Sequence, residues 1–166
     1  MLRQGLYNAP GGNVGGQDSK GGYDHFESRG LNAQIFSDGF SDGDQLGGIS
    51  HSLNGVERVE ILAGPGSALF GSGPPGGTIN IAHFAPSPVL HYGGSLQYGS
   101  FNSVTSSAYA TGPTGIDGLD FRADATVAHS DGFLDLERDD YELRPSATLK
   151  VSNHAVNLSI DLRHIH

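Results

Sequence analysis

Apolar and polar residues alternate through most of the second half of the chain. The clearest case is the segment 156–162, where Val, Leu, Ile and Leu stand at even positions and Asn, Ser and Asp lie between them. Neighbouring residues of a strand point to opposite sides of a sheet, so a period of two predicts strands with one apolar and one polar face. The alternation recurs in five segments, more weakly in the first two: 90–98, 104–110, 119–127, 141–151 and 156–162.

Turn signals separate these segments and complete the prediction of an antiparallel meander. They are rich in Gly, Ser, Asn and Asp and lie at 99–102, 112–118, 130–140 and 153–154. The strands between them are expected to be roughly 9–13 residues long, whereas strands of soluble sheets average about 5–6. A tilted strand that crosses a membrane needs about 9–11 residues, apolar outward and polar inward. Length and alternation together favour a membrane β-barrel, and a soluble β-meander is the alternative.

The first half of the chain is rich in glycine and has few regular patterns. A helical turn is expected at 67–70, with Ser67 as its N-cap, and a short helix or turn at 49–55. The pair Asp38-Gly39 is a turn signal. Short runs rich in β-branched and other apolar residues predict strands at 34–37, 56–62 and 78–81. This half is therefore predicted to be a small α+β unit.

The boundary between the halves is marked by two prolines in the sequence Phe84-Ala85-Pro86-Ser87-Pro88. Proline cannot donate a ladder hydrogen bond and restricts the residue before it, so this stretch favours an extended linker. We expect two domains, 1–85 and 86–166.

Composition excludes several classes of function. Nine Lys and Arg against 18 Asp and Glu give a formal net charge of −9, which disfavours partners that are themselves anionic, such as nucleic acid or an acidic lipid surface. The absence of cysteine excludes disulfides, thiolate nucleophiles and cysteine-based zinc sites. No apolar run approaches the roughly 18 residues of a membrane-spanning helix.

Several short motifs suggest cofactor or metal sites but lack residues that the chemistry requires. The segment 71–76 has the spacing G-x-G-x-x-G, but its two prolines and the strand after it exclude the helix of a dinucleotide site. The segment 66–71 has the glycine spacing of a phosphate-binding loop without its lysine. His164 and His166 share a strand face without a third ligand nearby, and the aspartates at 38, 42 and 44 do not follow calcium-loop spacing. We predict no cofactor, no metal site and no enzymatic activity.

One longer stretch is distinctive. Residues 56–71 read VERVEILAGPGSALFG, and residues 75–81 read PGGTINI. Together they closely resemble the plug-domain signature of TonB-dependent outer-membrane receptors. Weaker similarities precede them at 8–14, at Arg29-Gly30-Leu31 and at Asp38-Gly39. The resemblance covers residues 8–85 directly, and the alternating second half fits in order as the first barrel strands.

The resemblance implies a fold, a location and partners. Receptors of this family have a barrel of about 22 strands with the plug inside its lumen. They lie in the outer membrane and bind a scarce ligand, commonly a ferric siderophore and sometimes cobalamin, haem or a glycan. The TonB complex supplies energy by acting on a short segment before the plug. The fold class expected here is therefore an α+β plug domain followed by antiparallel strands of an incomplete transmembrane β-barrel, mostly β.

The resemblance also implies roles for individual residues. Plug arginines of the family, at the "R-G" and "E-R-V-E" motifs, pair with glutamates of the barrel, and the plug loops that follow the "R-G" and "D-G" motifs face outside, toward the ligand. The residues expected to take part in plug–barrel charge pairing are Arg29, Glu57, Arg58 and Glu60. Those expected to contact the ligand are Asn32, Gln34, Phe40 and Asp42.

The sequence also departs from the family pattern. No TonB-contacting segment or signal peptide is visible, and five strands cannot close a barrel, since the smallest bacterial ones have about 8. We therefore expect a fragment that covers most of a plug and the first barrel strands. Two other hypotheses remain at this stage: a soluble secreted β-rich module that binds a glycan or a protein, and a hydrolase or metal enzyme that uses the scattered His and Asp residues.

Overall fold

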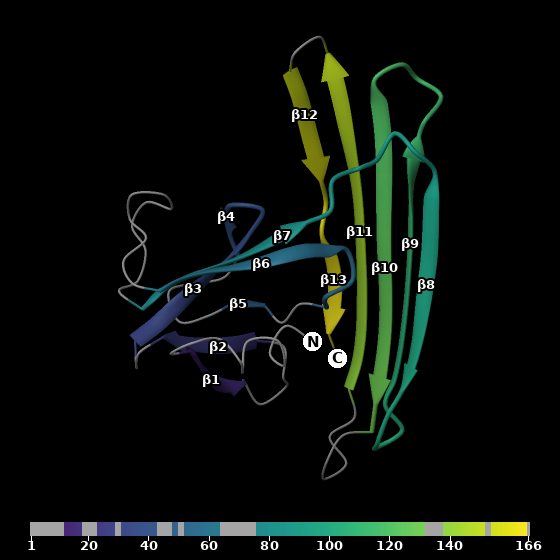
Figure 1. Ribbon diagram of the computed structural model, residues 1–166. Helices are drawn as coiled ribbons and strands as arrows, with labels where there is room; N and C mark the ends of the chain where they lie inside the picture. The colour runs from purple at the N-terminus through teal and green to yellow at the C-terminus, as the bar shows by residue number, and fades with distance from the viewer. Residues whose placement is uncertain are drawn as a thin grey trace. The chain divides into compact units, whose positions relative to one another are not determined.

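The computed structural model describes residues 12–17, 23–28, 31–42, 48–49, 52–63, 76–131, 138–151 and 154–165. Within these ranges every regular element is a strand. The chain divides into two compact units, Met1–Phe84 and Ala85–His166, and each unit has its own sheet (Figure 1). No helix long and apolar enough to cross a membrane occurs in the described residues.

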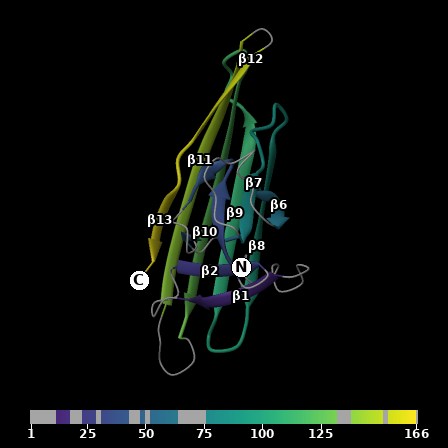
Figure 2. The ribbon, with the colours of Figure 1, turned by 90° about the vertical axis from the view of Figure 1, so that its left-hand side faces the viewer.

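The first unit contains a mixed sheet with the strand order β1-β2-β3-β7-β6. Strands β3 and β7 run parallel, and the other neighbours are antiparallel. Two short strands lie off this path, β4 beside β3 and β5 beside β2. Figure 2 shows β1 and β2 of this unit from a second side. The bounds are β1 Gly12–Gln17, β2 Tyr23–Ser28, β3 Leu31–Ser37, β4 Phe40–Ser41, β5 Gly48–Ile49, β6 Val56–Ala63 and β7 Gly77–His83.

The two central strands, β3 and β7, are buried on both faces. Their alternating side chains separate into an apolar face and a polar face. The apolar face forms a small core, and the polar face carries Gln34, Thr78 and Asn80, all at most 9% exposed. The core residues are Phe26, Ala33, Ile35, Ile79 and Ile81, with Val56 and Val59 packed against them.

The glycine-rich signature has a steric reason at Gly76, just before β7. A Cβ at this position would collide with the backbone carbonyl groups of Leu31 and Asn32 on β3. Only glycine allows the two chains to approach this closely. The residue therefore fixes how β7 enters the sheet beside β3.

The strands predicted for this unit at 34–37, 56–62 and 78–81 are confirmed, each slightly longer than predicted. The Asp38-Gly39 turn is also present, with both residues at positive φ. Within 49–55 the chain makes a turn at 54–55 rather than a helix, and the helical turn expected at 67–70 lies outside the described residues. β1 and β2 were not predicted, because a sequence such as GNVGGQ shows no alternation of apolar and polar residues.

The second unit is an antiparallel meander in the order β8-β9-β10-β11-β12, and β13 also pairs with β11. Between β12 and β13 the Ile160 N–H still donates to the Pro145 carbonyl at 3.0 Å, so these two segments form one interrupted strand along β11. The five predicted alternating segments are thus confirmed as strands. The bounds are β8 His91–Tyr98, β9 Val104–Pro113, β10 Leu119–Ser130, β11 Arg138–Val151, β12 His154–Ser159 and β13 Leu162–Ile165.

Exposure on this sheet is the reverse of that in a water-soluble protein. Seven polar side chains on one face are only 2–7% exposed; they are Thr111, Asp120, Arg122, Asp124, Thr126, Arg144 and Thr148. Large apolar side chains on the opposite face are 40–78% exposed; they are Tyr92, Leu96, Tyr98, Val127, Tyr141, Leu143, Leu149, Val156, Leu158 and Leu162. We call these the inner face and the outer face. A broad apolar face of this kind requires a nonpolar surrounding.

Candidate functional site

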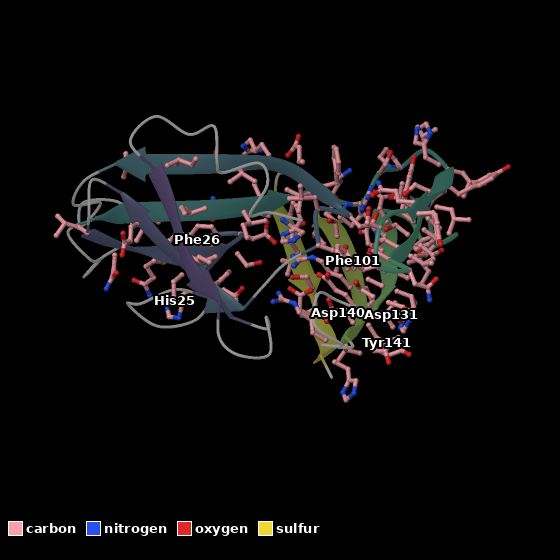
Figure 3. The ribbon with its side chains drawn as sticks, turned by 90° about the horizontal axis from the view of Figure 1, so that it is seen from below. His25, Phe26, Phe101, Asp131, Asp140 and Tyr141 are labelled. Atoms are coloured by element: carbon pink, nitrogen blue, oxygen red, sulfur yellow. The ribbon has the colours of Figure 1, made fainter. Side chains whose placement is uncertain are left out.

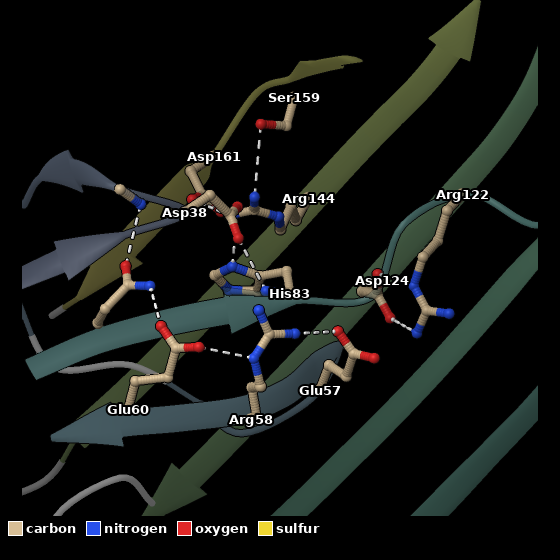
Figure 4. A network of polar contacts seen from close by, with 12 residues as sticks. Asp38, Glu57, Arg58, Glu60, His83, Arg122, Asp124, Arg144, Ser159 and Asp161 are labelled. Atoms are coloured by element: carbon tan, nitrogen blue, oxygen red, sulfur yellow. Dashed lines mark hydrogen bonds and ion pairs between the residues drawn. The ribbon is translucent and has the colours of Figure 1, made fainter. Parts of the chain in front are cut away.

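The turn between β3 and β4 is fastened to the end of β7. The Asp38 N–H donates to the Ile81 carbonyl at 2.9 Å. The Asp38 carboxylate accepts a hydrogen bond from the His83 backbone N–H at 2.8 Å, and its other oxygen lies 3.1 Å from His83 Nδ1 (Figure 4). Asp38 itself adopts a left-handed φ of 49°. Asp and Asn tolerate this conformation better than most residues, so the D-G pair suits a tight, fixed turn.

Three of the four residues expected to contact a ligand lie near this turn, whereas Asn32 lies at the opposite end of β3, beside Gly76 and the start of β7. Phe40 is 80% exposed at its tip, and Asn32 is exposed at the start of β3. Gln34 is 8% exposed, and its amide donates to Ser41 Oγ at 2.7 Å. Asp42 is half-buried, and its N–H donates to the Ile35 carbonyl at 2.9 Å. Phe40 can therefore meet a ligand at the turn, and Gln34 supports the strand that carries Phe40. Asn32 is exposed at the other end of β3, so the structure does not bring it together with Phe40.

Asn80 joins this turn to the charged strand β6. Its side-chain oxygen accepts a hydrogen bond from the Gly39 N–H at 3.0 Å, and its amide nitrogen donates to Glu60 Oε2 at 2.8 Å. The residue is only 9% exposed, so loss of either partner would leave a polar group with little access to water. Through this one amide, the position of the turn depends on the position of a carboxylate on β6.

Glu57, Arg58 and Glu60 form an ion-pair cluster on β6 (Figure 4). Arg58 Nε donates to Glu60 Oε1, and Arg58 Nη1 donates to Glu57 Oε2, both at 2.8 Å. The hydrogen bond from Asn80, followed by that from Arg58, lowers the pKa of Glu60. Glu60 also raises the pKa of Arg58. The three side chains are about half exposed, so the cluster serves as a charged surface.

The structure describes three of the four plug residues that were expected to pair with a barrel wall. Arg58, Glu57 and Glu60 pair with one another inside the first unit. Arg29 lies outside the described residues. Pairing with a barrel wall stays a prediction for all four.

The inner face of the second sheet holds a second set of polar contacts. Arg122 and Asp124 are two positions apart on β10, on the same face, and form two parallel hydrogen bonds with each other. Arg122 Nε donates to Asp124 Oδ2 at 2.8 Å, and Arg122 Nη2 donates to Asp124 Oδ1 at 2.6 Å. Their side chains are 8% and 6% exposed. The Arg122 guanidinium also lies 5.0 Å from the centre of the Tyr109 ring on β9. Two parallel bonds and a ring contact hold this arginine in one orientation.

A second group of ion pairs lies on the inner face along β11 and β13. Arg144 Nη1 donates to Asp161 Oδ2 at 2.6 Å, and Arg163 Nη2 donates to the same oxygen at 3.3 Å. Arg163 Nε lies 3.8 Å from Glu142. Both arginine side chains are nearly buried, at 7% and 12% exposed, so each needs its carboxylate partner. Lys150 Nζ lies 3.1 Å from the buried Asp120 carboxylate, but its own side chain is about half exposed.

The sequence did not predict these contacts as pairs, although some had a visible signal. Arg122 and Asp124 are two positions apart on one strand, and this spacing places both on one face. Asp161 gave no such signal toward Arg144, because the two residues are 17 positions apart in the sequence. Asn80 was missed because its partners, Glu60 and Gly39, are 20 and 41 residues away.

The candidate metal and cofactor motifs lie mainly outside the described residues. This holds for residues 66–75, for Asp44 and for His166, the expected companion of His164. No group of three or more His, Asp or Glu side chains arranged to bind a metal occurs in the described parts of the chain.

Comparison with protein families gives a match over residues 2–78 to the TonB-dependent receptor plug domain. The curated proteins that are similar in sequence include two outer-membrane receptors. The metal-pseudopaline receptor CntO of Pseudomonas aeruginosa is 37% identical over 81 residues, which are 48% of this chain and 11% of that protein. The ferrichrome outer membrane transporter/phage receptor of Escherichia coli K12 is 30% identical over 129 residues, which are 72% of this chain and 16% of that protein. The chain therefore spans about a ninth to a sixth of these relatives.

Solved structures share the fold. The pyoverdine outer membrane receptor FpvA of Pseudomonas aeruginosa matches 98% of this chain and 25% of its own chain, with a TM-score of 0.82 and 22% identity. The alcaligin outer membrane receptor FauA of Bordetella pertussis matches 97% of this chain and 28% of its own, with a TM-score of 0.78 and 21% identity. The order of a plug sheet followed by an antiparallel meander is thus common to all three proteins.

Proposed function

Because the chain belongs to the TonB-dependent outer-membrane receptors, we propose that residues 1–85 act as the plug and residues 86–166 as the first wall strands of a receptor that imports a metal–siderophore complex. The observation that carries the proposal is the reversed exposure of the second sheet, with apolar side chains outward and charges inward. This arrangement fits a wall between lipid and a polar lumen. It fits poorly with the alternative of a soluble secreted binding module, which would expose a broad apolar face to water.

The ligand class is proposed from the relatives. The two curated proteins are named for metal-pseudopaline and for ferrichrome, and both of these ligands are metal chelates. In this proposal the TonB complex acts on the plug and so drives import, and the described residues catalyse no reaction. Phe40 faces the ligand in this proposal, and Asp38, Asn80 and Glu60 tie the ligand-facing turn to the plug sheet. Asn32, at the opposite end of β3, does not belong to this turn.

The transport proposal is tested by uptake in cells whose only receptor of this kind is the receptor that contains this plug and these first wall strands. We expect accumulation of ferrichrome loaded with radiolabelled iron, or of metal-loaded pseudopaline, and loss of accumulation when TonB is removed. Uptake of neither chelate, or uptake that persists without TonB, would contradict the proposal.

The ligand-facing role of the turn is tested by Phe40→Ala. Covering an aromatic ring that is 80% exposed should stabilise a complex, so its removal should weaken binding of the transported chelate roughly tenfold, or about 1.4 kcal/mol. The matched control is Leu53→Ala, which removes another exposed apolar side chain of the same unit. Equal affinities for Phe40→Ala and the control would remove Phe40 from the ligand site without affecting the transport proposal.

A further inference from the structure

One histidine at the end of the second sheet lies between two carboxylates. His129 Nδ1 is 2.7 Å from Asp139 Oδ1, and His129 Nε2 is 3.1 Å from Asp131 Oδ1. Asp139 is the cross-strand partner of His129 on β11, and Asp131 follows the end of β10. The ring therefore connects the second-to-last pair of the β10–β11 hairpin to Asp131, the residue that follows β10.

Both contacts can be hydrogen bonds at the same time only when the ring is protonated. A carboxylate accepts hydrogen bonds and a neutral imidazole carries one N–H, so a neutral ring could donate to Asp139 or to Asp131 but not to both. The hydrogen bond to Asp139, with a smaller contribution from Asp131, raises the pKa of His129. The geometry and the charges therefore favour the imidazolium form.

The site lies beyond the apolar band of the sheet. The outer face is apolar as far as the pair Val127 and Tyr141, and the next pair outward is His129 with Asp139. Three ionisable groups in contact would be very costly inside a hydrocarbon layer, so this pair lies outside the membrane-spanning part of the strands. The groups that face the ring are Asp139 on β11, Asp131 just after the end of β10, and the uncharged Val104 on β9. Tyr141, the next outer-face residue of β11, contacts His164 on β13.

Asp131 connects this site to a neighbouring turn. Its backbone N–H donates to the Phe101 carbonyl at 3.0 Å. Phe101 and Asn102 form the centre of the β8–β9 turn, both with left-handed φ angles of 58° and 52°. This conformation is unusual for phenylalanine and has to be held by its surroundings. Figure 3 labels Phe101, Asp131 and Tyr141 in the same part of the second unit.

From this geometry we infer that His129 is a positioning residue: its doubly hydrogen-bonded, protonated ring fastens Asp131 to β11 and, through Asp131, holds the β8–β9 turn against the end of β10. Deprotonation leaves one of the two carboxylates without its donor, and the turn loosens. Because the pKa of the ring is raised in the folded protein, the contribution is complete below the ordinary histidine value of about 6.5 and is lost as the pH rises through the raised pKa. The inference concerns the sheet edge and does not depend on which ligand is transported.

The experiment measures the mobility of the β8–β9 turn as a function of pH. The chain has no cysteine, so Ser100→Cys in this turn provides one attachment point for a nitroxide in the segment. In the protein inserted into lipid vesicles, we expect an immobile label at pH 5, a mobile label at pH 9, and a midpoint above about 6.5. His129→Phe keeps a ring of similar size but cannot donate, so its label should be mobile at every pH.

Two further variants make the result specific. Asp131→Asn keeps the loop but removes one carboxylate, so the midpoint should fall. His154→Phe changes a different outer-face histidine, which is exposed at the start of β12, and should leave the midpoint unchanged. A label whose mobility does not change with pH, or a midpoint that survives His129→Phe, would overturn the inference. A midpoint abolished equally by His154→Phe would do the same.

Discussion

Replacing Leu143 by arginine is expected to lower the stability of the protein in a bilayer by about 2–4 kcal/mol. Leu143 is 45% exposed on the outer face of β11, where it pairs with Ala125 on β10 and Leu162 on β13. If this face contacts lipid, an arginine here must enter the hydrocarbon layer or distort the strand to avoid it. The measurement is reversible unfolding by denaturant from lipid vesicles, compared with the unmodified protein.

The control for this prediction is an arginine placed on the inner face. Ser107 on β9 is half-buried and lies opposite Thr126, close to the other polar residues of the sheet. Ser107→Arg should cost less than half as much as Leu143→Arg, because the inner face already accommodates Arg122 and Arg144 among carboxylates. If the two arginines cost the same, or if Leu143→Arg is neutral, the outer face does not contact lipid.

Arg122→Met is the second substitution with a large expected effect. It removes both hydrogen bonds to Asp124 and leaves a carboxylate that is only 6% exposed without its arginine. Breaking a buried ion pair on one side costs about 3–5 kcal/mol, because the remaining charge is desolvated and uncompensated. The same unfolding experiment measures this loss.

A double variant separates the charge effect from packing. In Arg122→Met with Asp124→Leu, both partners are apolar and no buried charge remains, so at least half of the lost stability should return. The ring of Tyr109 still has a neighbour of similar length at position 122. If the double variant is as unstable as Arg122→Met alone, the loss comes from the shape of residue 122, and the ion pair is not its cause.

The sequence predicted the second unit more completely than the first. In β10, the residues from Leu119 to Val127 alternate without exception, and a single period determines both the strand and its faces. The first unit lacks this regularity. β1 contains three glycines in six residues, and it becomes a strand only because β2 pairs with it.

The parallel pairing of β3 with β7 also could not be derived from local sequence. These strands are separated by about 40 residues, and their contact depends on Gly76 allowing close approach. The strand propensity of each segment says nothing about which strands pair, because the free energy of pairing depends on tertiary contacts. The family was predicted from the resemblance to the plug signature, because that signature is long and its motifs occur in a fixed order.

In the candidate site, too, local features could be predicted from the sequence and contacts between distant residues could not. The exposed tip at Phe40 follows directly from the Asp38-Gly39 turn signal, which the structure confirms. The role of Gln34 as a support for Ser41 does not follow, because a strand residue next to a turn can face either side. The Asp38–His83 contact joins residues 45 positions apart, and no spacing rule covers that distance.

The central claim, that the second sheet faces lipid on one side and a polar lumen on the other, is tested most directly by a spin-label scan of β10. Single cysteines at positions 119 to 127 are labelled one at a time in the vesicle-inserted protein, which is possible because this chain has no native cysteine. Collisions with oxygen, which concentrates in lipid, and with a water-soluble nickel chelate are then compared. We predict high oxygen access at Leu119, Phe121, Ala123, Ala125 and Val127 and low access at the positions between them. Access that does not alternate, or that is higher at the polar positions, would contradict the account.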